Sequence, residues 1–222
     1  MFTHKILAAT TALVLLTGCS MSSVMPNDDN IRTVKIKNEN QASPIDAYNN
    51  LAASYFQTQN IPAAKSAVTR SLEIEPNNAI SLNLMALILR AENDPVNSEM
   101  YFRKALSIDA NNPMLVNNYG SFLFWQERFS EACVQFEKAA NLNLRYPARN
   151  HAFENLGLCY LELQDEEKAK NAFKRSVDIN PREKALTEYI ILLRKHNEPY
   201  AAYANLLDSL LRSSGNPKDT RL

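Results

Sequence analysis

The sequence predicts an all-α fold, a right-handed superhelix of stacked helical hairpins (an α-solenoid), and three observations support this prediction. First, the segment 112–181 consists of two similar halves whose equivalent residues lie 37 positions apart. Second, two of the 4 glycines, Gly120 and Gly157, occupy the same place in these halves, inside otherwise helical patterns. Third, the pattern recurs upstream at a spacing of 34 residues. A glycine inside a helix costs about 1 kcal/mol relative to alanine, so its recurrence indicates a close contact between helices.

Each of the four clear repeats carries an apolar residue followed by Ala or Gly in its first helix, and an alanine or serine followed four residues later by an apolar residue in its second. Ala132 and Phe136 form the second pair in one copy, and Ala169 and Phe173 form it in the next. This pattern is that of tetratricopeptide repeats. We expect four clear repeats and a degenerate fifth that begins near Lys184, in a domain that spans 44–212. Each hairpin buries its apolar face only on a neighbour, so the array is stable as a stack.

Helix boundaries follow from capping residues and prolines. Ser43 and Pro44 suit the N-cap and the first position of a helix, and Pro62, Pro95 and Pro113 suit the starts of later helices. The inward positions expected of the first helix are Tyr48, Leu51, Ala52 and Tyr55. The polar segment 213–222 is expected to be a disordered tail.

Residues 1–18 have the features of a lipoprotein signal peptide. The apolar run 6–16 follows Lys5 and is shorter than the ~20 residues that span a bilayer, which is typical of a secretory signal. Gly18 before Cys19 makes LTGC a lipobox, so we expect a diacylglyceryl group on the Cys19 sulfur, with palmitate among its acyl chains. A simple signal peptide that happens to contain a cysteine is the alternative. Segment 19–43 is expected to be a flexible tether, and Ser20 favours the outer membrane over the inner membrane.

Composition and motifs argue against catalysis and against nucleic-acid binding. The formal net charge is +0, so no basic excess indicates nucleic acid. His151 and His196 lie in different repeats without a ligand pattern, and no nucleophile or phosphate-loop motif is present. We therefore expect a protein that is not an enzyme and has no cofactor, metal or small-molecule substrate. Export permits a disulfide between Cys133 and Cys159, but two buried free thiols are the favoured interpretation.

The candidate partner-binding groove lies on the first helix of each repeat. Counting starts at residues 45, 79, 113, 150 and 184, and positions 5, 6, 9 and 12 are expected to face the groove. Asparagine recurs there among apolar residues, and its amide suits the backbone of an extended peptide. A purely structural asparagine at position 6 is the alternative, and Trp125 is either a binding anchor or a lateral packing residue. The expected groove residues are Asn49, Asn50, Ala53, Phe56, Asn83, Leu84, Leu87, Asn117, Asn118, Phe124 and Trp125.

The segment 117–163, with NNYGSFLFW, LRYP and FENLGLCYLEL, resembles the type IV pilus biogenesis lipoproteins, the pilotins of the secretin channel. This resemblance implies a non-enzymatic adaptor anchored in the inner leaflet of the outer membrane and facing the periplasm. It also implies that the partner is the secretin, that the adaptor promotes secretin localisation and multimerisation, and that pili and twitching motility depend on it. The alternative is a periplasmic scaffold of the same repeat type that serves outer-membrane protein assembly or the regulation of peptidoglycan enzymes.

Overall fold

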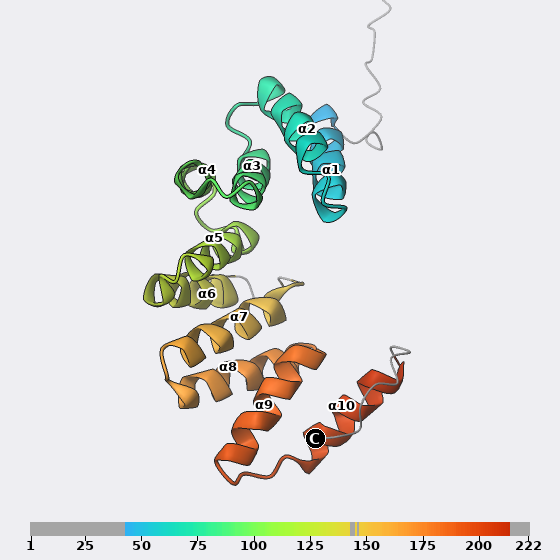
Figure 1. Ribbon diagram of the computed structural model, residues 1–222, viewed down its shortest axis with the longest axis vertical. Coiled ribbons are helices and arrows are strands. Elements are labelled where there is room, and N and C mark those ends of the chain that lie inside the picture. Colours follow the sequence, from blue (N-terminus) through green and yellow to red (C-terminus); the bar gives the residue numbers. More distant parts are fainter. Residues whose placement is uncertain (1–42, 143–144, 146, 214–222) are drawn as a thin grey trace, which may run out of the picture. The chain divides into compact units, whose positions relative to one another are not determined.

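The computed structural model describes residues 43–142, 145 and 147–213 of the chain. Within these ranges the protein is all-α, as predicted, and the helices form consecutive hairpins (Figure 1). The signal peptide, Cys19, the tether up to residue 42 and the tail from residue 214 lie outside the described residues. The helices are α1 Pro44–Gln57, α2 Ile61–Ile74, α3 Ala79–Ala91, α4 Pro95–Ile108, α5 Pro113–Trp125, α6 Phe129–Leu142, α7 Arg149–Glu162, α8 Glu166–Ile179, α9 Glu183–Lys195 and α10 Ala201–Ser213.

Capping residues set the helix starts where the sequence predicts them. The Ser43 hydroxyl accepts a hydrogen bond from the Asp46 backbone N–H at 3.1 Å, and α1 begins at Pro44. Helices α4 and α5 begin at Pro95 and Pro113, so these predictions are confirmed. Helix α2 begins at Ile61, one residue before the predicted proline, because the Asn60 side chain caps it. Each such cap satisfies a backbone N–H that has no partner within the helix.

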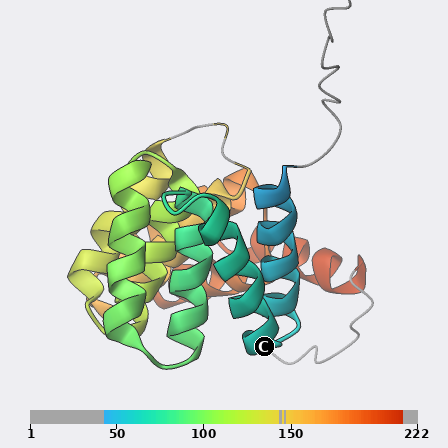
Figure 2. The ribbon, with the colours of Figure 1, turned by 90° about the horizontal axis from the view of Figure 1, so that it is seen from above.

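The helices pack in the order of the chain. Each odd-numbered helix packs against the helix that follows it, and each even-numbered helix up to α8 packs against the first helix of the next hairpin. The first helices also contact one another from α1 through α3 and α5 to α7. Figure 2, which looks along this series, shows α1 to α6 with neighbouring helices side by side. The core is therefore continuous across the hairpin boundaries, as the repeat pattern requires.

Gly120 and Gly157 are packing glycines, as the sequence predicts. A Cβ added to Gly120 would lie 2.8 Å from Cε1 of Phe136, and one added to Gly157 would lie 2.6 Å from Cε1 of Phe173. Both rings are buried. The glycines thus allow the second helix of each hairpin to press an aromatic ring onto the backbone of the first.

The first and last hairpins depart from this pattern. Leu51 was expected to point inward, but its side chain is 43% exposed, whereas the equivalent Met85, Tyr119 and Leu156 are buried. The reason is that no described helix precedes α1 to cover it. At the other end Ile191 takes the place of the packing glycine and is 49% exposed, and Leu207 is the buried residue of α10. The two helices of the fifth repeat therefore pack together less closely than those of the earlier repeats.

The turn inside each hairpin places one non-glycine residue in the left-handed region of backbone space. The φ angles lie between 56° and 60°. L-residues with a side chain meet a steric cost there of roughly 1–2 kcal/mol. These residues are Gln59, Asn93, Glu127, Gln164 and Asn197. No helix within the described ranges is long and apolar enough to cross a bilayer.

Candidate functional site: the first-helix face and its amide ladder

We call the surface formed by α1, α3, α5 and α7 the first-helix face, and the predicted groove residues lie on these helices. Asn49 and Asn83 were expected to face an open surface, and this expectation is wrong because they are only 6% and 2% exposed. The first helix of the next hairpin packs over position 5 and covers both amides. Their side chains are therefore not available to a partner's backbone.

Buried and partly buried asparagines form a ladder that runs from repeat to repeat. Nδ2 of Asn118 donates to Oδ1 of Asn83 at 3.2 Å, and Nδ2 of Asn155 donates to Oδ1 of Asn117 at 3.2 Å. Position 6 of one repeat therefore donates to position 5 of the repeat before it. A buried amide without such a partner would cost about 1–3 kcal/mol. The ladder satisfies these amides and fixes the alignment of neighbouring hairpins. Asn118 and Asn155 at position 6 therefore have a structural role, which is the alternative given for asparagines at this position.

The ladder ends differently at its two termini. At the start, Oδ1 of Asn49 accepts from the Ser81 hydroxyl at 2.9 Å, because position 6 of the second repeat is a leucine. At the end, Glu154 holds position 5, and its buried Oε2 has no hydrogen-bond partner in the described part of the chain. Nη1 of Arg182 lies 3.8 Å from that oxygen and donates to Nε2 of His151 at 2.7 Å. Burial and the Arg182 guanidinium lower the pKa of His151.

A small pocket opens on the first-helix face between the third and fourth repeats. Its volume is about 220 Å³. The lining combines aromatic and aliphatic side chains with one hydroxyl, one amide and one ammonium group. It consists of Ser121, Phe124, Phe136, Asn155, Leu158 and Lys184. The pocket therefore has the size and chemistry for one apolar side chain, with polar groups at its rim.

The other predicted groove residues divide by exposure. Asn50 is exposed, whereas Ala53, Phe56, Leu84 and Leu87 are partly buried. Asn117 and Phe124 are also partly buried. Trp125 is 44% exposed and its ring lies 6.2 Å from that of Phe122. One part of the indole therefore lies beside Phe122, and the rest is accessible at the surface.

The two cysteines of the repeat domain form a disulfide. Cys133 on α6 and Cys159 on α7 are bonded, with their Cα atoms 5.6 Å apart. The interpretation as two buried free thiols is therefore wrong. Both residues are buried, as expected, but the packing of α6 against α7 places them in bonding geometry. The bond joins the third repeat to the fourth.

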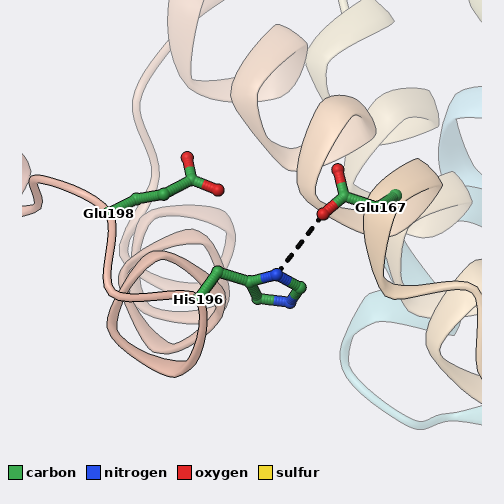
Figure 3. A group of neighbouring side chains, drawn as sticks. All are labelled: Glu167, His196 and Glu198. Atoms are coloured by element: carbon green, nitrogen blue, oxygen red, sulfur yellow. Dashed lines mark ion pairs between the residues drawn. The ribbon is translucent and has the colours of Figure 1, made fainter.

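Three side chains that could hold a metal ion, Glu167, His196 and Glu198, lie together where α8 begins and α9 ends (Figure 3). Nδ1 of His196 lies 3.4 Å from Oε1 of Glu167. The ammonium of Lys170 lies 3.0 Å from the same carboxylate and also pairs with Glu198. Lys170 thus supplies the positive charge between the two carboxylates. The cluster is an ionic contact that ties the turn before α10 to α8.

Known protein families share this repeat architecture. Tetratricopeptide repeat models match residues 45–78, 79–112 and 112–182. The chain is 35% identical over 185 residues to the type IV pilus assembly protein PilF of Pseudomonas aeruginosa, covering 82% of this chain and 70% of that protein. The chain belongs to the PilF family of tetratricopeptide repeat proteins.

Solved structures agree with this family. A Pseudomonas aeruginosa PilF structure matches with a TM-score of 0.72 and 32% identity, covering 80% of this chain and 78% of that one. PilW, described as a widely conserved type IV pilus biogenesis factor, shares the fold with a TM-score of 0.62 and 23% identity, covering 80% of this chain and 89% of PilW. The relatives are assembly and biogenesis factors, and the PilF-family chain is a non-enzymatic protein.

Proposed function

We propose that the protein is a pilotin, an outer-membrane lipoprotein adaptor that binds the type IV pilus secretin and promotes its localisation and multimerisation. The observation that carries this proposal is the 35% identity to the pilus assembly protein PilF over 82% of the chain. The lipobox that ends at Cys19 supports an anchor in the inner leaflet of the outer membrane. Several acyl chains on that residue give the stable attachment that one chain does not.

The first-helix face is the proposed partner site. In the expected right-handed superhelix this face is the concave one. It combines the pocket beside Phe124 with the partly buried Leu84 and Leu87 and the exposed part of Trp125. Apolar pockets with a few polar groups hold the alternate side chains of an extended segment. Because the ladder uses Asn83 and Asn118 internally, the site relies more on these pockets than on amide contacts to a peptide backbone.

Deletion of the gene tests the adaptor role. We expect the secretin polypeptide to remain, with few detergent-resistant multimers and no surface pili, because no reaction product is missing and only assembly fails. The measurement is immunoblotting of unboiled outer membranes together with a twitching assay. Normal multimers in the deletion strain would contradict the proposal and favour a scaffold for another envelope machine.

Two substitutions test the anchor and the face separately. Cys19→Ala should abolish incorporation of labelled palmitate and move the protein out of the outer membrane, and persistent label would refute the lipidation site. Ser121→Tyr fills the pocket from α5 and should reduce secretin capture from solubilised membranes. Ser107→Tyr, on the exposed side of α4, is the matched control and should capture as well as the wild type. Equal capture by both variants would exclude this pocket.

A further inference from the structure

Arg90 occupies an unusual place on the first-helix face. It stands at position 12 of the second repeat, in the last turn of α3. Phe56 and Phe124 hold the same position in the repeats before and after it, and Phe124 lines the pocket described above. The helices α1, α3 and α5 contact one another in that order. The sequence of groups along this line of the face is therefore aromatic, cationic, aromatic.

Arg90 is partly buried, and none of the described residues supplies a counter-charge to its guanidinium. The partly buried Arg128 pairs with Glu99 at 2.9 Å, and the partly buried Arg149 donates to the Ala140 carbonyl at 2.7 Å. In the described part of the chain, Arg90 makes no ion pair, side-chain hydrogen bond or stacking contact of this kind. Burial lowers the pKa of Arg90, and no carboxylate opposes this effect. Pairing with a carboxylate therefore stabilises a partly desolvated cation of this kind.

The side chains around Arg90 indicate which kind of partner would carry this carboxylate. Leu87 lies one turn before Arg90 on α3 and is partly buried, and Leu84 precedes it on the same helix. A free anion would leave these apolar groups and the flanking phenylalanine positions without a contact. An acidic side chain with apolar neighbours in an extended segment would engage both. Bidentate pairing of arginine with a carboxylate also fixes the direction of the segment.

We propose that Arg90 is the carboxylate anchor of the first-helix face, and that the bound partner segment is extended and carries an aspartate or glutamate between apolar residues. This inference rests on the proposed function of the face and specifies the chemistry of its partner. Arginine is enriched among the residues that dominate binding energy at interfaces. The site differs from a clamp for a chain terminus because Arg90 is flanked at position 12 by the phenylalanines of the neighbouring repeats and not by further cations.

A second role for Arg90 would be to stabilise the C-terminus of α3 through the helix dipole. The two roles predict opposite effects of Arg90→Met. Replacing an unpaired, partly desolvated cation by an apolar side chain of similar length should leave the melting temperature unchanged or raise it. Loss of a dipole contact should lower it. Thermal unfolding of the full-length protein in detergent, followed by circular dichroism, separates the two.

Peptide binding tests the anchor directly. Three fluorescein-labelled nonapeptides share one sequence with a central Phe-Asp-Leu, Phe-Asn-Leu or Phe-Lys-Leu, flanked by serine and glycine. The full-length protein should bind the Asp peptide at least about tenfold more tightly than the Asn peptide, which is about 1.4 kcal/mol, because a hydrogen bond between two charged groups is stronger than one to a neutral amide. Arg90→Met should remove this discrimination, Arg90→Lys should retain part of it, and Arg90→Glu should favour the Lys peptide. Arg70→Met, on the exposed face of α2, is the matched control.

The outcomes separate this inference from the proposed function. Equal affinity for the three peptides, or no binding of the Asp peptide by the wild type, would overturn the inference. Discrimination that survives in Arg90→Met would also overturn it. If the wild type captures the secretin and Arg90→Met captures it equally, the anchor is wrong and the adaptor role stands. If the Asp peptide is selected through Arg90 but no secretin is captured, the adaptor role fails and the anchor stands.

Discussion

Replacing Gly157 by leucine tests how tightly the fourth hairpin closes. The first added atom would lie 2.6 Å from Cε1 and 2.7 Å from Cζ of Phe173, which is fully buried, so the ring can move away only by displacing other core side chains. Overpacking of a core costs roughly 1–3 kcal/mol, and the upper part of this range applies because even the Cβ overlaps the ring. The higher helix propensity of leucine offsets ~1 kcal/mol of this loss. The net loss in the free energy of unfolding is therefore about 2 kcal/mol.

Thermal unfolding of Gly157→Leu, followed by far-ultraviolet circular dichroism, measures this loss. For a domain of this size the melting temperature should fall by roughly 4–8 °C, at about 2–4 °C per kcal/mol. Ile191→Leu places the same side chain at the equivalent position of the fifth repeat, where the residue is half exposed, and should shift the melting temperature little. If Gly157→Leu melts within about 2 °C of the wild type, the close contact with Phe173 does not constrain the hairpin.

Three further changes have defined outcomes. Burial opposes ionisation of Glu99, but hydrogen bonds from Arg103, Arg128 and Tyr119 hold its pKa below the ordinary value. The loss of stability caused by Glu99→Gln should therefore be complete above about pH 5 and should disappear as the pH falls through the lowered pKa. Urea titrations at a series of pH values would detect or exclude this dependence. Glu127→Gly should raise the free energy of unfolding by about 0.5–1 kcal/mol, because glycine accepts the positive φ; a lower urea midpoint would refute this. Reduction of the disulfide should cost roughly 3.5 kcal/mol for the 26-residue separation. The melting temperature with and without reductant measures this loss, and an unchanged value would contradict it.

The parts of the fold that sequence analysis predicted correctly are those encoded locally. The spacing of Gly120 and Gly157 identifies the packing contact, because a helical glycine has few other uses at one repeated position. Capping by Ser43 and the prolines that start α4 and α5 act within a single turn of helix. Such signals need no knowledge of which hairpin lies next to which.

The errors concern contacts between repeats. The pattern of position 5 suggested an exposed face, but the next hairpin covers Asn83 and satisfies its amide. Leu51 matches its buried equivalents in sequence, yet it lies on the first hairpin, where no described helix covers it. The pairing of Cys133 with Cys159 depends on how α6 meets α7, and their spacing in the chain does not encode this. The missing signal in each case is the geometry of the neighbouring repeat.

The disulfide has a consequence for the cooperativity of the array. Repeat proteins can open one unit at a time, because each unit is held only by its neighbours. The bond between Cys133 and Cys159 crosses the boundary between the third and fourth repeats, so these two units must open together. The pocket that contains Ser121 and Leu158 lies across the same boundary. Its two walls are therefore held together before any partner arrives, which lowers the entropy lost on binding.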